Sequence, residues 1–195
     1  MENISTGNRV LTSKQKISTK QMVAMAMLSA ISIVFITLVR FPIFPAAPFL
    51  EYDPADIPIL IGTFLYGPIA GFILTVIVSV IQGATVSAGS GIIGIIMHIV
   101  ATGSCTLIAG TIYFRNKTRK SAVIALTVGA ITMTIAMVLL NLVLTPLFMG
   151  APLEAVLAMM VPIIIPFNLV KSGMNCFITF FLYKSISHVI KSQHK

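Results

Sequence analysis

One long uncharged stretch determines the fold class of this chain. Residues 57–114 read IPILIGTFLYGPIAGFILTVIVSVIQGATVSAGSGIIGIIMHIVATGSCTLIAGTIYF, which is 58 residues without Lys, Arg, Asp or Glu. As a helix, at about 1.5 Å per residue, the stretch is about 87 Å long. That length matches about three crossings of a bilayer core of about 30 Å. Gly67-Pro68 and the glycine-rich residues 87–91 mark turns, and they divide the stretch into predicted spans at about 54–66, 68–86 and 91–113.

The first of these three spans is short for a bilayer, and its start has a recognisable signal. Asp53 is followed by Pro54. Aspartate is a preferred N-cap residue, and proline is tolerated at the first helical position because its missing N–H has no partner there anyway. We therefore expect Asp53 to cap this helix and Pro54 to begin it.

The rest of the chain supplies three more spans. Of 195 residues, 57% are hydrophobic and 9% are charged, and the mean hydropathy is +1.02; an ordinary soluble domain has about 25% charged residues. Further apolar runs lie at residues 22–39, about 122–147 and about 163–183. The sequence thus predicts an all-α integral membrane protein, a compact bundle of six transmembrane helices.

The positive charges mark membrane sidedness. The formal net charge is +8, and all but two of the 13 Lys and Arg residues lie in three short polar segments. The positive-inside rule places these segments in the cytoplasm, so both termini are expected there, and nucleic acid is not the expected partner. The predicted organisation is a basic N-terminal segment (1–21), one membrane domain (22–186) and a cytoplasmic tail (187–195).

A proline-stiffened loop follows the first span on the outer side. Residues 41–58 contain five of the ten prolines and three of the five acidic residues, together with several large apolar side chains. A flexible linker would instead be rich in Gly and Ser. Two interpretations remain: the loop caps the bundle beside the short second span, or residues 41–53 form a lid over an outward-facing ligand pocket.

Polar residues inside the spans point to a pocket under this loop, because such residues are functional candidates in a membrane. Lys171 is the only unambiguous intramembrane charge, and Asn168 and Asn175 share its helix face. The alternative is that the amides bond between helices and that Lys171 reaches outward to Glu51 or Asp53. The predicted site for a neutral, amphipathic ligand comprises Phe49, Leu50, Glu51, Tyr52, Asp53, Gln82, Thr85, Asn141, Asn168, Lys171 and Asn175.

Residue patterns typical of catalysis or ion coupling are missing from the spans. His98 has no second histidine at i+4 and no carboxylate near it in sequence, so we expect a buried, hydrogen-bonded residue and no metal site. Cys105 and Cys176 are expected to be two small buried side chains. The spans offer no Asp or Glu for ion coupling and no nucleotide-binding loop, so uphill transport would require a partner that supplies energy.

Small residues four apart suggest where such a partner would dock. Ala26 and Ala30 have this spacing in the cytoplasmic half of the first span, and Gly67 and Gly71 repeat it at the next inner turn. The spacing lets helices approach closely. It serves internal packing as readily as docking, so both interpretations are kept.

These features together resemble a known family. The basic N-terminus, Ala26-x-x-x-Ala30, an outer loop reading FLEYDPADIP over residues 49–58 and six spans in about 190 residues look like the substrate-binding S components of energy-coupling-factor (ECF) vitamin transporters. The loop and the turn at residues 67–71 look most like the riboflavin-specific member. The resemblance covers essentially the whole chain.

The resemblance implies a function. It implies a multi-pass protein of the bacterial cell membrane that binds riboflavin at its outer face as a transported ligand, with no cofactor. A transmembrane T component and two ABC ATPases would supply the work, and Ala26 and Ala30 would contact the T component. An S component for another vitamin such as thiamine or biotin, an FMN-binding protein, or a small integral membrane enzyme are the alternatives.

Overall fold

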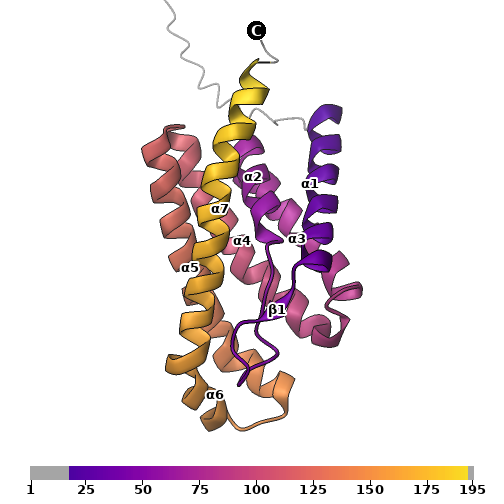
Figure 1. Cartoon of the computed structure of the whole chain (residues 1–195), viewed down its shortest axis with the longest axis vertical. Coiled ribbons are helices and arrows are strands. Elements are labelled where there is room, and N and C mark those ends of the chain that lie inside the picture. The colour runs from indigo at the N-terminus through magenta and orange to yellow at the C-terminus, as the bar shows by residue number, and fades with distance from the viewer. Residues whose placement is uncertain (1–17, 193–195) are drawn as a thin grey trace, which may run out of the picture.

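The computed structural model describes residues 18–192, with side chains as far as Tyr183; the first 17 residues of the basic N-terminal segment and the end of the tail, 193–195, lie outside the described part. The fold is a helical bundle (Figure 1). Its elements are α1 (Thr19–Leu38), β1 (Phe41–Pro42), β2 (Glu51–Tyr52), α2 (Asp56–Tyr66), α3 (Pro68–Ala84), the 3-10 turn η1 (Ala88–Ser90), α4 (Gly91–Arg115), α5 (Arg119–Met149), α6 (Leu153–Met159), the π-helical turn η2 (Met160–Ile164) and α7 (Ile165–Ser192).

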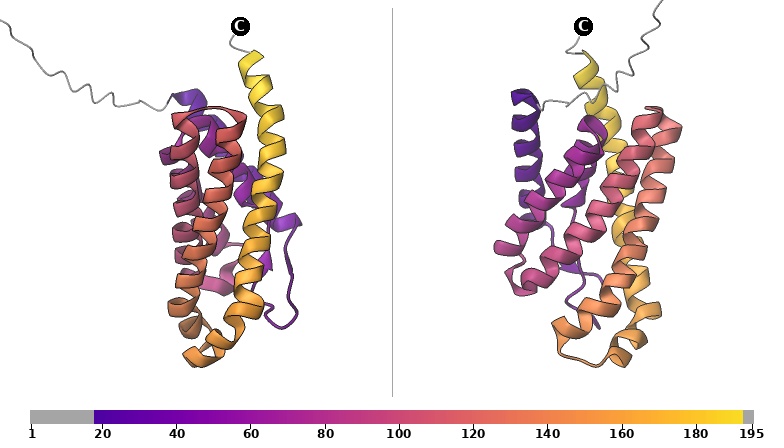
Figure 2. Two further views of the ribbon diagram at one scale, coloured as in Figure 1. Left: turned by 90° about the vertical axis from the view of Figure 1, so that its left-hand side faces the viewer. Right: turned by 180° about the vertical axis from the view of Figure 1, so that it is seen from behind.

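The long helices lie side by side and run back and forth along the long axis of the bundle, which therefore has two distinct ends. The start of α1, the end of α7 and the α4–α5 turn lie at one end, whereas the loop between α1 and α2 and helix α6 lie at the other (Figures 1 and 2). The basic residues Lys20, Arg115, Lys117, Arg119 and Lys120 therefore gather at a single end. The charge pattern predicted that the basic segments share one side of the membrane, and these described residues do share one end of the bundle.

Helix α2 lies inside the bundle, in contact with α1, α3, α4 and α7. Every residue from Asp56 to Phe64 is buried, as expected for a helix that is apolar on all sides. Gly67 ends it with φ of 105°, a conformation that favours glycine, and Pro68 begins α3. The predicted turn at Gly67-Pro68 is thus confirmed.

The predicted start of α2 is wrong. The helix begins at Asp56, with Ala55 at the N-cap and no side-chain cap. Asp53 Oδ1 instead accepts the Ala55 N–H at 3.1 Å in the turn before the helix. Its other oxygen contacts Lys171, so this carboxylate holds a distant helix as well as the local backbone.

The last helical region begins earlier than the predicted span at 163–183. Helix α6 starts at Leu153 and continues through η2 into α7. Pro162 and Pro166 both lack a backbone N–H, and a missing donor disturbs regular α-helical bonding. The resulting π turn is a common irregularity near functional sites.

The outer surface of the bundle is apolar. Val143 and Phe177, for example, are 65% and 66% exposed. Four helical segments are long and apolar enough to cross a membrane: Thr19–Leu38, Ala88–Arg115, Arg119–Met149 and Leu153–Tyr183. Helices α2 and α3 are shorter, with 11 and 17 residues. The protein is a helical membrane protein.

Candidate functional site: a cavity beneath the lid loop

The lid loop, residues 41–53, is fastened at its base and packed at its tip. Strands β1 and β2 pair antiparallel, with Phe41 opposite Tyr52. Ala47, near the tip, and Leu50, just before β2, are buried in one apolar cluster with Val156 of α6 and Ile164 of η2. The loop therefore packs against α6 and η2, whereas the sequence had suggested a cap beside the short second span, and it also forms part of a cavity wall.

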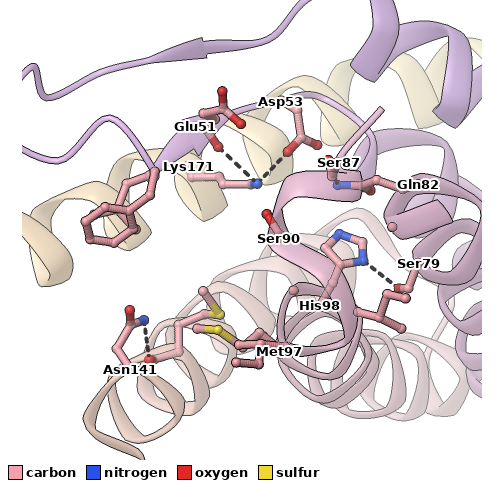
Figure 3. Close-up of a pocket in the computed structure, with 18 of the residues that line it drawn as sticks. Glu51, Asp53, Ser79, Gln82, Ser87, Ser90, Met97, His98, Asn141 and Lys171 are labelled. Atoms are coloured by element: carbon pink, nitrogen blue, oxygen red, sulfur yellow. Dashed lines mark hydrogen bonds and ion pairs between the residues drawn. The ribbon is translucent and has the colours of Figure 1, made fainter. Parts of the chain in front are cut away.

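A cavity lies between the lid loop and the ends of α1, α3, α4, α5 and α7 (Figure 3). It combines apolar walls with a few polar and charged groups, which is typical of small-molecule sites. Eight of the eleven predicted site residues line it: Phe49, Leu50, Glu51, Asp53, Gln82, Asn141, Asn168 and Lys171.

Lys171 joins α7 to the lid loop. Its Nζ lies 2.7 Å from Asp53 Oδ2 and 3.5 Å from the Glu51 backbone oxygen. Figure 3 marks both contacts with dashed lines. The Lys171 and Asp53 side chains are 12% and 5% exposed. A buried lysine requires such a partner. The two interpretations of Lys171 are thus compatible: it pairs with Asp53 and it also lines the cavity.

Tyr52 and Asn175 lie outside the cavity lining, which corrects their predicted place in it. The Tyr52 hydroxyl donates to Asn175 Oδ1 at 3.1 Å, and Asn175 Nδ2 donates to the Asp53 backbone oxygen at 3.1 Å. Burial, and next the charge of Asp53, raise the pKa of Tyr52 above its ordinary value, so its hydroxyl stays a donor. These two residues hold the base of the lid loop against α7.

Thr85 is also outside the lining. It follows the last turn of α3, is exposed, and donates to the Ile81 backbone oxygen at 2.6 Å. Helix α3 ends at Ala84, two residues before the predicted end of this span, and the chain then turns away into η1. Thr85 therefore lies beyond the helix that brings Gln82 into the lining.

The three amide side chains of the lining differ in which of their hydrogen-bonding groups have a protein partner. Asn141 donates to Met137 O at 2.7 Å and accepts from Thr145, while Asn168 donates to Ile164 O at 2.8 Å in the π turn. Gln82 Nε2 donates to Ser87 Oγ at 3.3 Å. Its Oε1 is a buried acceptor with no hydrogen-bond partner among the described residues. Such an unsatisfied atom beside a cavity is a natural contact for a ligand donor.

His98 is hydrogen-bonded, as predicted, but only partly buried, and the fold brings to it a carboxylate that its neighbours in sequence do not supply. Its Nδ1 lies 2.7 Å from Ser79 Oγ, and its Nε2 lies 3.2 Å from Asp56 Oδ1. Asp56 is therefore a buried carboxylate inside the bundle, where the sequence predicted none. The two residues are distant in sequence, and only the packing of α2 against α4 brings them together.

Several lining residues were missed by the sequence analysis. They include the apolar walls Met97, Met133, Met137, Phe148 and Phe167, and the polar Ser79, Ser87, Ser90 and His98. One signal was available: Met133, Met137 and Asn141 repeat at intervals of four and thus share a helix face.

Arg40 lies in the cavity lining and bridges two segments at its rim. Its guanidinium contacts the Glu51 carboxylate at 2.5 Å and donates to the backbone oxygen of Val86. Val86 belongs to the turn between α3 and α4. Arg40 thereby connects the lid loop to this turn across the rim of the cavity.

The small residues predicted for docking divide into two groups. Ala26 and Ala30 are exposed and line an apolar groove between α1 and α3. A Cβ on Gly71 would lie 2.0 Å from Thr63 Oγ1 of α2. Gly71 therefore serves internal packing, whereas the alanines remain available to a partner. Cys105 and Cys176 are free and buried, as predicted.

Comparison with known proteins identifies the family. The model of the family "ECF transporter, substrate-specific component" matches residues 20–183, which is most of the chain and the whole region that builds the cavity. The chain belongs to this family. The family consists of transporter components and not of enzymes, so this S component is a part of a membrane transporter.

Curated relatives and a solved structure agree with that assignment. The riboflavin transporter RibU of Staphylococcus aureus is 31% identical over 95% of this chain and 98% of its own length. The riboflavin transporter FmnP of Bacillus subtilis is 31% identical over 78% and 84%. A solved S component of a bacterial ECF transporter is 31% identical, with a TM-score of 0.76 over 88% of this chain and 98% of that one.

Proposed function

We propose that this S component binds riboflavin in the cavity beneath the lid loop and mediates its uptake. The observation that carries the proposal is the composition of that cavity, which offers apolar walls, amides and paired charges in one place. Relatives that cover most of this chain are named riboflavin transporters. Their names point to the same ligand as the chemistry of the walls.

The chemistry of riboflavin suits the lining. Its flat tricyclic ring has an apolar dimethylbenzene edge, which matches the methionine and phenylalanine walls; thioethers pack favourably against aromatic rings. The polar pyrimidine edge suits amides such as Asn141 and Asn168, and the unsatisfied Gln82 Oε1 suits an N–H or O–H donor. The hydroxylated ribityl tail suits Glu51 and Lys171.

The charges favour a neutral flavin over FMN. Each of the two carboxylates that line the cavity faces a basic group: Glu51 faces Arg40 and Asp53 faces Lys171. A phosphate dianion would have to take one basic group from its carboxylate. A ligand without net charge leaves both pairs intact, so riboflavin is the preferred ligand.

We further infer six crossings, with both termini in the cytoplasm of a bacterium. The gathering of basic residues at one end of the bundle supports this orientation, and buried α2 with α3 would supply the two short crossings. The groove at Ala26 and Ala30 would receive the T component, and two ABC ATPases would drive release. The lid loop would then face outward.

The absorbance spectrum of the purified protein is the first test. A yellow preparation with flavin bands, and quenching of riboflavin fluorescence on titration, are the expected results. Competition with FMN, thiamine and biotin establishes the specificity. A colourless protein that leaves riboflavin fluorescence unchanged, or one that binds thiamine or biotin in preference, would overturn the proposal.

A further inference from the structure

Behind the cavity wall lies a carboxylate that does not line the cavity. Asp56, the first residue of α2, is 1% exposed. Thr102 Oγ1 donates to its Oδ1 at 2.9 Å, and Asn175 Nδ2 donates to its Oδ2 at 3.1 Å. A buried carboxylate is tolerated when donors surround it in this way.

Asp56 also lies beside the His98 ring. His98 Nε2 is 3.2 Å from Asp56 Oδ1, within ion-pair distance, and is recorded with no hydrogen-bond partner among the described residues. An ionised carboxylate only accepts hydrogen bonds, so a proton on this ring nitrogen is the form that the carboxylate favours. The other nitrogen, Nδ1, lies 2.7 Å from Ser79 Oγ. The Ser79 contact holds Nδ1 in the cavity wall (Figure 3), and the Asp56 carboxylate lies beside Nε2 on the other side of the ring.

A second connection runs from Asp56 to the lid loop. Asn175 divides its two N–H groups between Asp56 Oδ2 and the Asp53 backbone oxygen, each at 3.1 Å. Its Oδ1 accepts from Tyr52 at 3.1 Å. The cavity wall and the base of the lid loop are therefore attached to one carboxylate.

We propose that Asp56 is a positioning residue for the flavin pocket, which acts through His98 and Asn175 to hold the wall and the base of the lid loop in their binding geometry. The inference rests on the proposed function. It requires that loss of the carboxylate weakens riboflavin binding although Asp56 itself touches no ligand. A merely structural residue would lower the melting temperature and leave affinity unchanged in the folded protein.

The matched comparison is Asp56→Asn against Thr102→Val. The first variant keeps the shape of the side chain but removes its negative charge. Its new NH2 group replaces one of the two oxygens that face His98 and Asn175. The second removes one donor to the same carboxylate and leaves both connections intact. We expect riboflavin Kd to rise at least about tenfold in Asp56→Asn and to stay within about threefold in Thr102→Val, with the melting temperature of each ligand-free protein measured alongside.

A double-mutant cycle tests whether Asp56 acts through His98. If it does, the losses of riboflavin affinity in Asp56→Asn and His98→Gln are not additive in free energy. The Kd of the double variant is then close to that of whichever single variant binds riboflavin less tightly. Two losses that multiply, or wild-type affinity in Asp56→Asn, would overturn the inference. A wild-type protein that fails to bind riboflavin would instead overturn the proposed function.

A measurement on the unmodified chain covers the case in which Asp56→Asn does not fold. In protein labelled with 15N-histidine, the chemical shifts of the two ring nitrogens report which of them carries a proton, and loss of a signal in His98→Gln identifies His98. The inference requires a protonated Nε2 at neutral pH. An unprotonated Nε2 would show that Asp56 is not its acceptor and would overturn the proposal.

Discussion

The ammonium group of Lys171 lies 2.7 Å from the Asp53 carboxylate, so an ion pair ties the last long helix to the base of the lid loop. Both side chains are largely buried, and Lys171 also faces the cavity. Because each group compensates the charge of the other, a change in either one acts on stability and on ligand binding at the same time. Experiments on this pair must separate the two effects.

Lys171→Met deletes the charge and keeps the apolar stem. If the ammonium also bonds to riboflavin, affinity falls by about 1.5–3 kcal/mol, the range for a charged hydrogen bond, or roughly ten- to two-hundredfold in Kd. Fluorescence titration measures the affinity, and the melting temperature without ligand measures stability.

The double variant Lys171→Met/Asp53→Asn is the control for that experiment. A lone buried Asp53 destabilises the fold by about 3–5 kcal/mol, and neutralising it restores much of this loss. We expect the melting temperature to recover and the affinity to stay low. Wild-type affinity in either variant would remove Lys171 from the ligand contacts.

Bulky residues at Ala26 or Ala30 should separate binding from transport. Leucine at either position fills the groove between α1 and α3, which shares no lining residue with the cavity, and blocks close approach of a partner helix. Riboflavin uptake should fall at least about tenfold, while Kd changes less than about twofold. Ala158→Leu, at an exposed position of α6, is the matched control and should leave uptake intact; equal loss in both variants would contradict the docking assignment.

Arg40→Gln should loosen the lid loop. It removes the contact with Glu51 and weakens the contact with Val86. The Arg40 and Glu51 side chains are 30% and 32% exposed, so the effect on stability should be small. Stopped-flow fluorescence should show riboflavin dissociation faster by about three- to tenfold. Arg119→Gln, at the opposite end of the bundle, serves as the comparison, and equal dissociation rates would exclude Arg40 as a fastening of the lid loop.

Gly71→Ala tests the packing of α2 against α3. The new methyl group would overlap the fully buried Thr63 side chain, and overpacking of this kind costs about 1–3 kcal/mol of unfolding free energy. Thermal unfolding in detergent should show a lower midpoint. Gly173→Ala has open space around its Cβ and should hold or raise the midpoint; a loss there as large as at Gly71 would point to helix-wide effects and not to this contact.

The membrane class and the positions of the long helices could be predicted from the sequence alone. The lengths of the uncharged stretches and the positions of the basic residues can be read directly from the sequence. In lipid, a helix satisfies all backbone hydrogen bonds of such a stretch within the stretch itself. The shared face of Asn168 and Lys171 followed from helical periodicity. The exact helix starts could not be predicted in this way. The local sequence of Asp53 is compatible with an N-cap, but in the fold its carboxylate pairs with Lys171 and α2 begins at Asp56.

The pairs that define the site were settled by the tertiary structure. Lys171 had two candidate partners in the lid loop, and packing brought Asp53 to its ammonium; His98 had no visible partner, and packing of α2 against α4 supplied Asp56. Periodicity tells which face of a helix a residue occupies, but not which residue of a distant segment meets that face. That buried polar groups need partners in lipid follows from the residue types and their positions in the spans, whereas the identity of each partner follows from the packing of segments that are distant in sequence.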